Sequence, residues 1–243
     1  VAVTEGVEDP TATAELTFAL ILAAQRRLPH YITALKHGAW QQSGLRAVSL
    51  PQNFGLGRAL KGTTLGIWGF GKIGTLVAGF GRAFGMNVLI WGSEHSTVRA
   101  KEAGFEVAQS RAALFEKSDV LSIHLRLSES TTHLITLEDL SRMKPQSLFV
   151  NTARAELLAP DALVSALNRG RPGFAAVDVY ESEPILQGHL LLRMENTLTT
   201  PHLGFVELNS YERYFDSAFR NILAFFQGTY TQVINKEALQ LRR

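Results

Sequence analysis

The chain has 243 residues, a formal net charge of +2 and no cysteine. The absence of cysteine excludes disulfides, iron–sulfur ligation and a thiol nucleophile, and the dispersed Lys and Arg residues argue against a nucleic-acid partner. With 46% hydrophobic and 19% charged residues, the composition is typical of a globular protein, and the apolar runs near the start are too short to span a bilayer. We therefore expect a cytoplasmic protein with no membrane partner.

The N-terminal part predicts one long helix followed by a loop. Residues 1–6 are expected to be the end of a buried element, which suggests a piece of a longer protein. A helix with an apolar stripe is predicted to begin at Pro10, to kink at Pro29 and to stop at Gly38. Residues 41–61 have the composition of a loop.

A glycine-rich turn follows the first strand-like segment, residues 65–68, and precedes a predicted helix at 75–84. In this G-x-G-x-x-G pattern, Gly69 permits a tight turn, Gly71 lets the backbone approach a pyrophosphate, and Gly74 lets the helix pack closely on the strand. The helix N-terminus then offers N–H groups and a partial positive charge to the phosphates. The residues of this turn expected to bind a dinucleotide are Gly69, Gly71, Lys72, Ile73 and Gly74.

Strand-like and helix-like segments alternate from this turn to residue 204. The predicted strands are 65–68, 88–91, 105–107, 120–125, 147–151, 174–179 and 197–200. The predicted helices are 75–84, 98–103, 111–117, 137–143, 160–168 and, after the last strand, 206–226. This alternation predicts an α/β fold with a doubly wound parallel sheet.

The residues after the second strand bear on the identity of the dinucleotide. An acidic residue that binds the adenosine ribose usually ends this strand, but position 92 is glycine. Glu94 lies two residues later and either reaches the ribose or is solvated. A 2′-phosphate prefers a basic neighbour, and only His95 and Arg99 are near in sequence. We favour NAD as the cofactor, and NADP remains open.

Three further motifs each follow a predicted strand. They are Asn-Thr-Ala-Arg ending at Arg154, Glu-Ser-Glu-Pro containing Glu183, and Thr-Pro-His ending at His202. Because ligands bind at the carboxyl ends of strands in open α/β sheets, these three side chains are expected to converge on one crevice.

Together with the glycine turn, these motifs resemble the D-isomer-specific 2-hydroxyacid dehydrogenase family, which includes phosphoglycerate, glycerate and formate dehydrogenases. The resemblance extends over essentially the whole chain and includes residues 84–86, 124–127 and 131–135. It implies a Rossmann-like cofactor domain and an oxidoreductase that transfers a hydride between NAD(P) and a D-2-hydroxy acid. No metal is implied.

The resemblance also implies a role for each matching residue. His202 corresponds to the acid/base that exchanges a proton with the substrate hydroxyl, and Glu183 to the carboxylate that orients its ring. Arg154 corresponds to the group that binds the substrate carboxylate and polarises its carbonyl. Asp178 corresponds to an acid near the nicotinamide carboxamide, whereas His124 has either a cofactor-binding or a structural role. The expected cofactor contacts beyond the turn are Ser93, Glu94, His124, Thr152, Ala153, Asp178 and Gly204.

Two departures from the family pattern carry expectations of their own. Ala155 stands where the family commonly has glycine, which would cost about 1 kcal/mol if that position required a positive φ. Most of the substrate domain is expected to be absent, which would leave an isolated chain that binds dinucleotide but turns over poorly. Apolar surface on 18–28 and 215–226 is then expected to be exposed in a monomer.

The resulting domain prediction has three parts. Residues 1–60 form a crossover and dimerisation helix with its linker, 61–204 the dinucleotide-binding domain, and 205–243 a helical segment that returns toward the substrate domain. The expected partners are a small 2-hydroxy or 2-oxo acid and a second copy of the chain. Two alternatives remain open: a dinucleotide-sensing, corepressor-like interaction module and a non-catalytic fragment.

Overall fold

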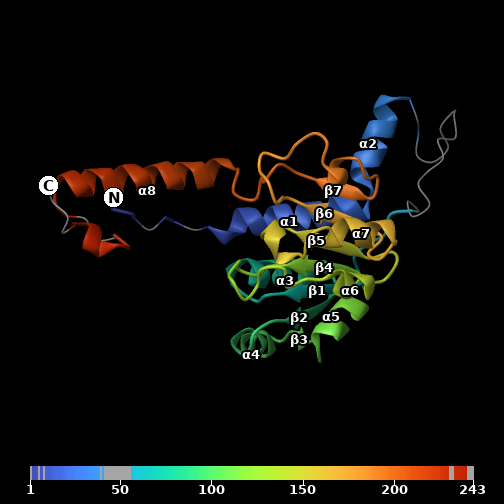
Figure 1. Cartoon of the computed structure of the whole chain (residues 1–243). Coiled ribbons are helices and arrows are strands. Elements are labelled where there is room, and N and C mark those ends of the chain that lie inside the picture. Colours follow the sequence, from blue (N-terminus) through green and yellow to red (C-terminus); the bar gives the residue numbers. More distant parts are fainter. Residues whose placement is uncertain are drawn as a thin grey trace.

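A parallel sheet with helices on both faces forms the body of the protein, and one long helix leads away from it (Figure 1). The structure is a computed structural model. The residues that it describes are 2–4, 6–7, 9–38, 40, 56–229 and 233–239.

The elements of the described chain alternate between strand and helix after two initial helices. The strands are β1 (Thr64–Trp68), β2 (Asn87–Trp91), β3 (Glu106–Val107), β4 (Val120–Ile123), β5 (Leu148–Asn151), β6 (Phe174–Val177) and β7 (Thr197–Thr199). The helices are α1 (Pro10–Gln25), α2 (Leu28–Lys36), α3 (Lys72–Ala83), α4 (Glu94–Glu102), α5 (Arg111–Lys117), α6 (Leu137–Ser141), α7 (Ala162–Asn168) and α8 (Leu208–Phe226). Short 3₁₀ turns are η1 (Ala155–Leu157), η2 (Leu190–Leu192) and η3 (Lys236–Leu239).

The described strands form one sheet in the order β3-β2-β1-β4-β5-β6-β7, and all neighbouring pairs are parallel. The chain therefore reverses its direction of winding between β1 and β4, which is the topological switch point where such sheets bind ligands. In register, Trp68 pairs with Ile123, Ile123 with Asn151, and Asn151 with Val177. These pairs align the carboxyl ends of the central strands, and the predicted doubly wound fold is confirmed.

Each face of the sheet has its own apolar core because successive side chains of a strand point to opposite faces. On one face, α1 and α3 pack over residues such as Leu65 and Ile67. On the other face, α5, α6 and α7 cover a core that includes Phe115 and Phe149, both fully buried. Burial of each such side chain stabilises the fold by about 1.5–3 kcal/mol.

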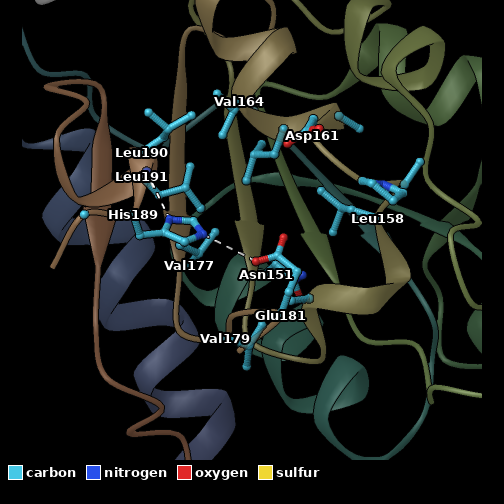
Figure 2. Close-up of a pocket in the computed structure, with 16 residues that line it drawn as sticks. Asn151, Leu158, Asp161, Val164, Val177, Val179, Glu181, His189, Leu190 and Leu191 are labelled. Atoms are coloured by element: carbon cyan, nitrogen blue, oxygen red, sulfur yellow. Dashed lines mark hydrogen bonds and ion pairs between the residues drawn. The ribbon is translucent and has the colours of Figure 1, made fainter. Parts of the chain in front are cut away.

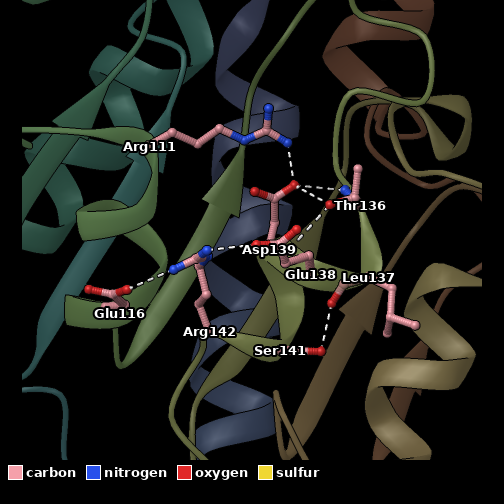
Figure 3. Close-up of polar contacts among 8 residues, drawn as sticks. All are labelled: Arg111, Glu116, Thr136, Leu137, Glu138, Asp139, Ser141 and Arg142. Atoms are coloured by element: carbon pink, nitrogen blue, oxygen red, sulfur yellow. Dashed lines mark hydrogen bonds and ion pairs between the residues drawn. The ribbon is translucent and has the colours of Figure 1, made fainter.

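A polar network holds the segment after β4 against α5 and α6 (Figure 3). Asp139 forms a capping box with Thr136, because its carboxylate accepts from the Thr136 N–H and the Thr136 hydroxyl accepts from the Asp139 N–H. Arg111 donates to the same carboxylate and to the backbone carbonyl of Leu134, and its guanidinium lies 5.0 Å from the centre of the Trp68 ring. These contacts position the loop that leaves the switch point.

The first helix is interrupted close to the predicted kink. Asp9 caps α1 through a 2.9 Å hydrogen bond from the Thr11 N–H. The break lies at Arg27, which has a φ of 57°, and Pro29 occupies the first turn of α2, where its missing N–H is harmless. Gly38, with a φ of 81°, follows α2 as the predicted stop.

Four helices begin at other residues than predicted. α3 begins at Lys72 rather than at 75, because Gly71 is already its N-cap. α4 begins at Glu94 rather than at 98, because the Ser93 hydroxyl caps it by accepting from the Ser96 N–H. α7 begins at Ala162 rather than at 160, because Asp161, with a φ of 55°, is its N-cap. α8 begins at Leu208, two residues later than predicted.

The predicted buried terminus and one predicted apolar surface are wrong. Val3 is 51% exposed, and next to it only a single antiparallel bridge joins Thr4 to Val233 among the described residues. Phe18 and Ile21 are buried, because α1 packs against α3 and the sheet instead of presenting this face to solvent. Residues 41–55, which belong to the predicted loop, lie outside the described residues. No helix in the described part of the chain has the length and apolarity needed to cross a membrane.

Candidate functional site

The glycine turn between β1 and α3 has the geometry of a phosphate cradle. Gly69 has a φ of 105°, and a Cβ there would lie 2.5 Å from the backbone oxygen of His124. A Cβ at Gly74 would lie 2.1 Å from the Gly69 oxygen, whereas one at Gly71 would meet nothing within 4 Å. Gly71 caps α3 without a side chain, which leaves N–H groups of the first helical turn for an anion. The turn therefore fits a dinucleotide pyrophosphate.

The side chains around this turn differ in their surroundings. Lys72 is exposed at the start of α3, and Ile73 packs against the apolar core beneath the helix. Arg99 reaches from α4 to the turn, where its Nη1 donates to the Phe70 oxygen at 3.2 Å. A guanidinium is thus anchored beside the cradle.

The end of β2 leaves little room for the acid that was expected at position 92. A Cβ at Gly92 would lie 3.0 Å from the Cβ of Ser96 on α4. Ser93 is occupied as the cap of that helix, and Glu94 is exposed as its first residue. Of the three residues at positions 92–94, only Glu94 therefore offers a carboxylate near the glycine turn.

His124 lies directly after β4, opposite the first glycine of the turn. Its backbone N–H donates to the Trp68 oxygen at 2.8 Å, and its ring Nε2 lies 2.9 Å from the hydroxyl of Ser122. Burial lowers the pKa of His124 to about 4. The ring is therefore neutral at pH 7, with one nitrogen engaged inside the protein.

Arg154 extends from a turn that is built by Asn151, the last residue of β5. The buried Asn151 side chain donates to the Arg154 oxygen at 2.8 Å and accepts from the Ala153 N–H at 3.0 Å. Arg154 is exposed, and its Nη1 donates to the Ala153 oxygen at 2.6 Å. The fixed turn therefore presents a guanidinium at the carboxyl edge of the sheet.

Two residues of the same turn differ from expectation. The Thr152 hydroxyl is buried, 2.7 Å from the hydroxyl of Thr17 on α1, and it links the turn to that helix. Ala155 does not have the positive φ that would strain it and begins the turn η1. The expected cost of alanine at this position is therefore absent.

Asp178, directly after β6, organises the segment that contains His202. Its Oδ1 accepts from the Thr200 hydroxyl at 2.6 Å and from the Leu203 N–H at 2.8 Å, and its Oδ2 accepts from the Gly204 N–H at 2.9 Å. The Asp178 side chain is fully buried. Sequence reasoning missed this internal role, because the donors lie more than 20 residues away and carry no local signal.

His202 and Glu183 form a direct pair at the same edge. The Nδ1 of His202 lies 2.6 Å from Oε2 of Glu183, whose Oε1 accepts from the Tyr180 N–H at 3.0 Å. Burial on its own would raise the pKa of the Glu183 carboxyl. The hydrogen bonds from His202 and Tyr180, together with the positive charges of His202 and Arg154, outweigh burial and hold this pKa below its ordinary value.

The backbone of His202 is itself held in an uncommon conformation. Its φ is 53°, a left-handed value that costs a non-glycine residue free energy and that clusters at functional sites. Since Nδ1 faces Glu183, Nε2 is the ring nitrogen left to face a ligand. The charge of Arg154 acts on Glu183, which links all three predicted catalytic residues electrostatically.

Among the residues that the structure describes, no group of three or more His, Asp or Glu side chains is placed to hold a metal ion. Acid–base and electrostatic chemistry is what the described side chains at this edge can supply.

Comparison with known proteins identifies the family. Residues 18–204 match the NAD binding domain of the D-isomer specific 2-hydroxyacid dehydrogenases. The chain belongs to this family. A glyoxylate reductase of Aeropyrum pernix is 39% identical over 233 residues, which are 96% of the chain and 68% of that protein.

Solved structures of relatives share the fold of this D-2-hydroxyacid dehydrogenase chain. An oxidoreductase from Ralstonia solanacearum superposes with a TM-score of 0.93 at 64% identity, covering 98% of this chain and 70% of that one. A D-lactate dehydrogenase from Aquifex aeolicus, solved with NAD and lactic acid, has a TM-score of 0.76 at 32% identity, covering 94% of this chain and 70% of that one. The chain thus spans about 70% of the length of these structures.

Proposed function

We propose that this chain carries the catalytic and cofactor-binding part of an enzyme that interconverts a D-2-hydroxy acid and its 2-oxo acid. The observation that carries the proposal is the 2.6 Å contact between His202 and Glu183, with the charge of Arg154 acting on the same carboxylate. The contact supports an acid/base pair beside an anion-binding group, which is what this reaction requires.

His202 is the proposed acid/base. The lowered pKa of Glu183 keeps its carboxylate ionised near neutrality. An ionised carboxylate accepts from Nδ1–H and stabilises the imidazolium. Nε2 then donates a proton to the carbonyl oxygen during reduction of the oxo acid and removes it from the hydroxyl during oxidation.

Arg154 is the proposed anchor for the substrate carboxylate. A guanidinium presents a planar pair of donors that matches a carboxylate, and its charge also polarises the neighbouring carbonyl. The Asn151 side chain fixes the turn from which Arg154 extends, which supports the pre-organisation that this role needs.

The nicotinamide supplies the hydride when the cofactor is bound. Gly69, Gly71 and the first turn of α3 would hold the pyrophosphate, with Glu94 toward the adenosine ribose. NAD is favoured because Glu94 is an acid that can accept from a ribose hydroxyl, and Arg99 beside the turn leaves NADP as the second possibility. Neutral His124 would line the edge that the nicotinamide half crosses.

The proposal also covers organisation of the chain. Residues 61–204 would act as the dinucleotide-binding unit, with 1–60 as a crossover and dimerisation segment and 205–243 as a segment that returns toward a substrate domain. The identity of the acid would depend on residues of that domain.

The test is a panel of 2-oxo acids, including glyoxylate, pyruvate and hydroxypyruvate, assayed with NADH and NADPH at the nicotinamide absorbance. The panel is assayed on a form of the protein that includes the proposed substrate domain, because the isolated chain is expected to turn over poorly. Reduction of at least one acid, strongly slowed in His202→Gln, is the expected result. Binding of NADH without turnover of any acid would favour the interaction module instead.

A further inference from the structure

A cavity of about 370 Å³ lies beside α7, at the carboxyl ends of β5 and β6 (Figure 2). It is on the face covered by α5, α6 and α7, away from α1. Its size falls within the range of small-molecule sites, which is about 300–1,000 Å³. The family's reaction as proposed above does not use this cavity.

The floor of this cavity is apolar and its mouth is polar. The buried apolar residues that line it are Ala155, Leu158, Ala162, Leu163, Val177, Val179 and Leu191. Asn151, Asp161, Glu181 and His189 contribute polar side chains. Such a combination of a dry floor and a few convergent polar groups is characteristic of a site for a small amphipathic molecule.

The charge at the mouth is negative. Asp161 and Glu181 both line the cavity, and no Lys or Arg is among its lining residues in the described chain. Asp161 precedes α7 without capping it. The Asp161 carboxylate thus makes no helix-capping hydrogen bond.

The imidazole of His189 is oriented toward Glu181. Its Nδ1 accepts from the Leu191 N–H at 3.2 Å, which makes Nε2 the protonated nitrogen of the neutral ring. Nε2 lies 3.5 Å from Oε2 of Glu181. The His189 ring therefore lies beside the Glu181 carboxylate, which stays 61% exposed and accessible to a ligand.

We propose that this cavity is a second binding site, for a small organic cation with an apolar body. The apolar part would lie on the floor and the ammonium group between Asp161 and Glu181. A substrate carboxylate would be repelled by the same two residues. The cavity therefore selects against the anions that Arg154 is suited to bind.

The position of the cavity connects it to both segments of the proposed catalytic site. Asn151 lines it and also builds the Arg154 turn. Glu181 lines it and lies two residues before Glu183. A bound ligand would therefore contact Asn151, which holds the Arg154 turn, and Glu181, which belongs to the segment that carries Glu183.

Ligand-observed saturation-transfer NMR on the 243-residue chain tests the site with three probes of matched shape: phenethylamine, 2-phenylethanol and phenylacetate. The amine is expected to bind about tenfold more tightly than the alcohol, because a hydrogen bond to a charged group is stronger than one between neutral groups. Phenylacetate is expected to show no binding. The readout does not depend on turnover, and its failure would leave the proposed reaction untouched.

Variants locate the binding. Asp161→Asn and Glu181→Gln should each weaken the amine several-fold, and Gly188→Phe, which has open space around its Cβ, should weaken all three probes. Glu129→Gln, an exposed acid outside the cavity, should change nothing. Equal binding of amine and alcohol, no binding of the amine, or insensitivity to both acid variants would overturn the proposal.

Discussion

Glu183 is the residue through which the candidate catalytic groups influence one another. Its two oxygens accept from His202 and from the Tyr180 N–H, and the charge of Arg154 acts on it as well. Each of these contacts favours the ionised form, and together they outweigh the effect of burial. An ionised Glu183 in turn fixes which nitrogen His202 presents to a substrate.

Replacing His202 by Gln should remove the proton donor while it retains a polar side chain of similar size. We expect kcat for reduction of a 2-oxo acid to fall by about 10²–10⁴-fold, with little change in NADH affinity measured by fluorescence. His37→Gln, on the exposed surface of the described chain, is the control and should leave both values unchanged. A loss of tenfold or less would argue against His202 as the acid/base.

Replacing Arg154 by Gln should raise the pKa of Glu183, because the guanidinium charge helps to lower it. The measurement is an NMR titration of the Glu183 side-chain carboxyl carbon. Arg154→Lys retains the charge and should leave this pKa near its wild-type value. Lysine lacks the planar pair of donors that binds a carboxylate, and the KM for the oxo acid should therefore rise in Arg154→Lys although the charge is retained. An unchanged Glu183 pKa in Arg154→Gln would show that the Arg154 charge does not act on this carboxyl.

The lowered pKa of His124 predicts that the folded protein loses stability on acidification. Burial lowers its pKa from 6.5 to about 4, and between these values the unfolded chain binds a proton that the folded chain does not. Its contribution is therefore full above pH 6.5 and falls as the pH approaches 4, by at most about 3 kcal/mol. Urea unfolding at pH 4.5 and 7 should show a smaller difference for His124→Asn than for wild type. His95→Asn, on the exposed side of α4, should retain the full difference.

At the scale of elements, local patterns identified most of the strands and helices but not how their side chains are held. The β1–turn–α3 unit was predictable because each glycine has a local steric task. The break at Arg27 was placed only near Pro29, since a left-handed residue other than glycine gives no sequence signal. The bonds of Asp178 to Thr200 and Gly204 join distant segments, and only the folded sheet brings them together.

Three glycines of α3 and its cap provide a graded test of the cradle. Gly74→Ala should destabilise the fold by about 1–3 kcal/mol, because its Cβ would overlap the Gly69 oxygen. Gly71→Ala has space and a φ of −85°, and it should keep the melting temperature but weaken dinucleotide binding. Gly79→Ala, which faces open space in the same helix, should stabilise it by about 0.5–1 kcal/mol. Calorimetry measures the stability of each variant, and NADH titration measures its affinity for the dinucleotide. Unchanged NADH affinity in Gly71→Ala would contradict the proposed role of this turn in binding the pyrophosphate.

At the scale of the whole molecule, α8 is the element that does not belong to the body. It leads away from the sheet (Figure 1), and the Asp9–Arg213 ion pair holds its first turns near the start of α1. Tyr211, Phe215 and Phe219 stack along it with ring centres 6.3 Å apart. Phe215 and Phe219 are 58% and 61% exposed, which confirms the predicted apolar surface at this end of the chain.

An exposed aromatic row of this length should drive association of the 243-residue chain, because monomeric proteins rarely leave large contiguous apolar patches in water. Light scattering should show a mass that rises with concentration. The pair of substitutions Phe215→Lys and Phe219→Lys should abolish this rise without lowering the melting temperature, since neither side chain is buried. Glu212→Lys, on the same helix but outside the row, should still associate. A wild-type chain that stays monomeric at millimolar concentration would contradict this prediction. It would show that exposure of the aromatic row is not sufficient for association.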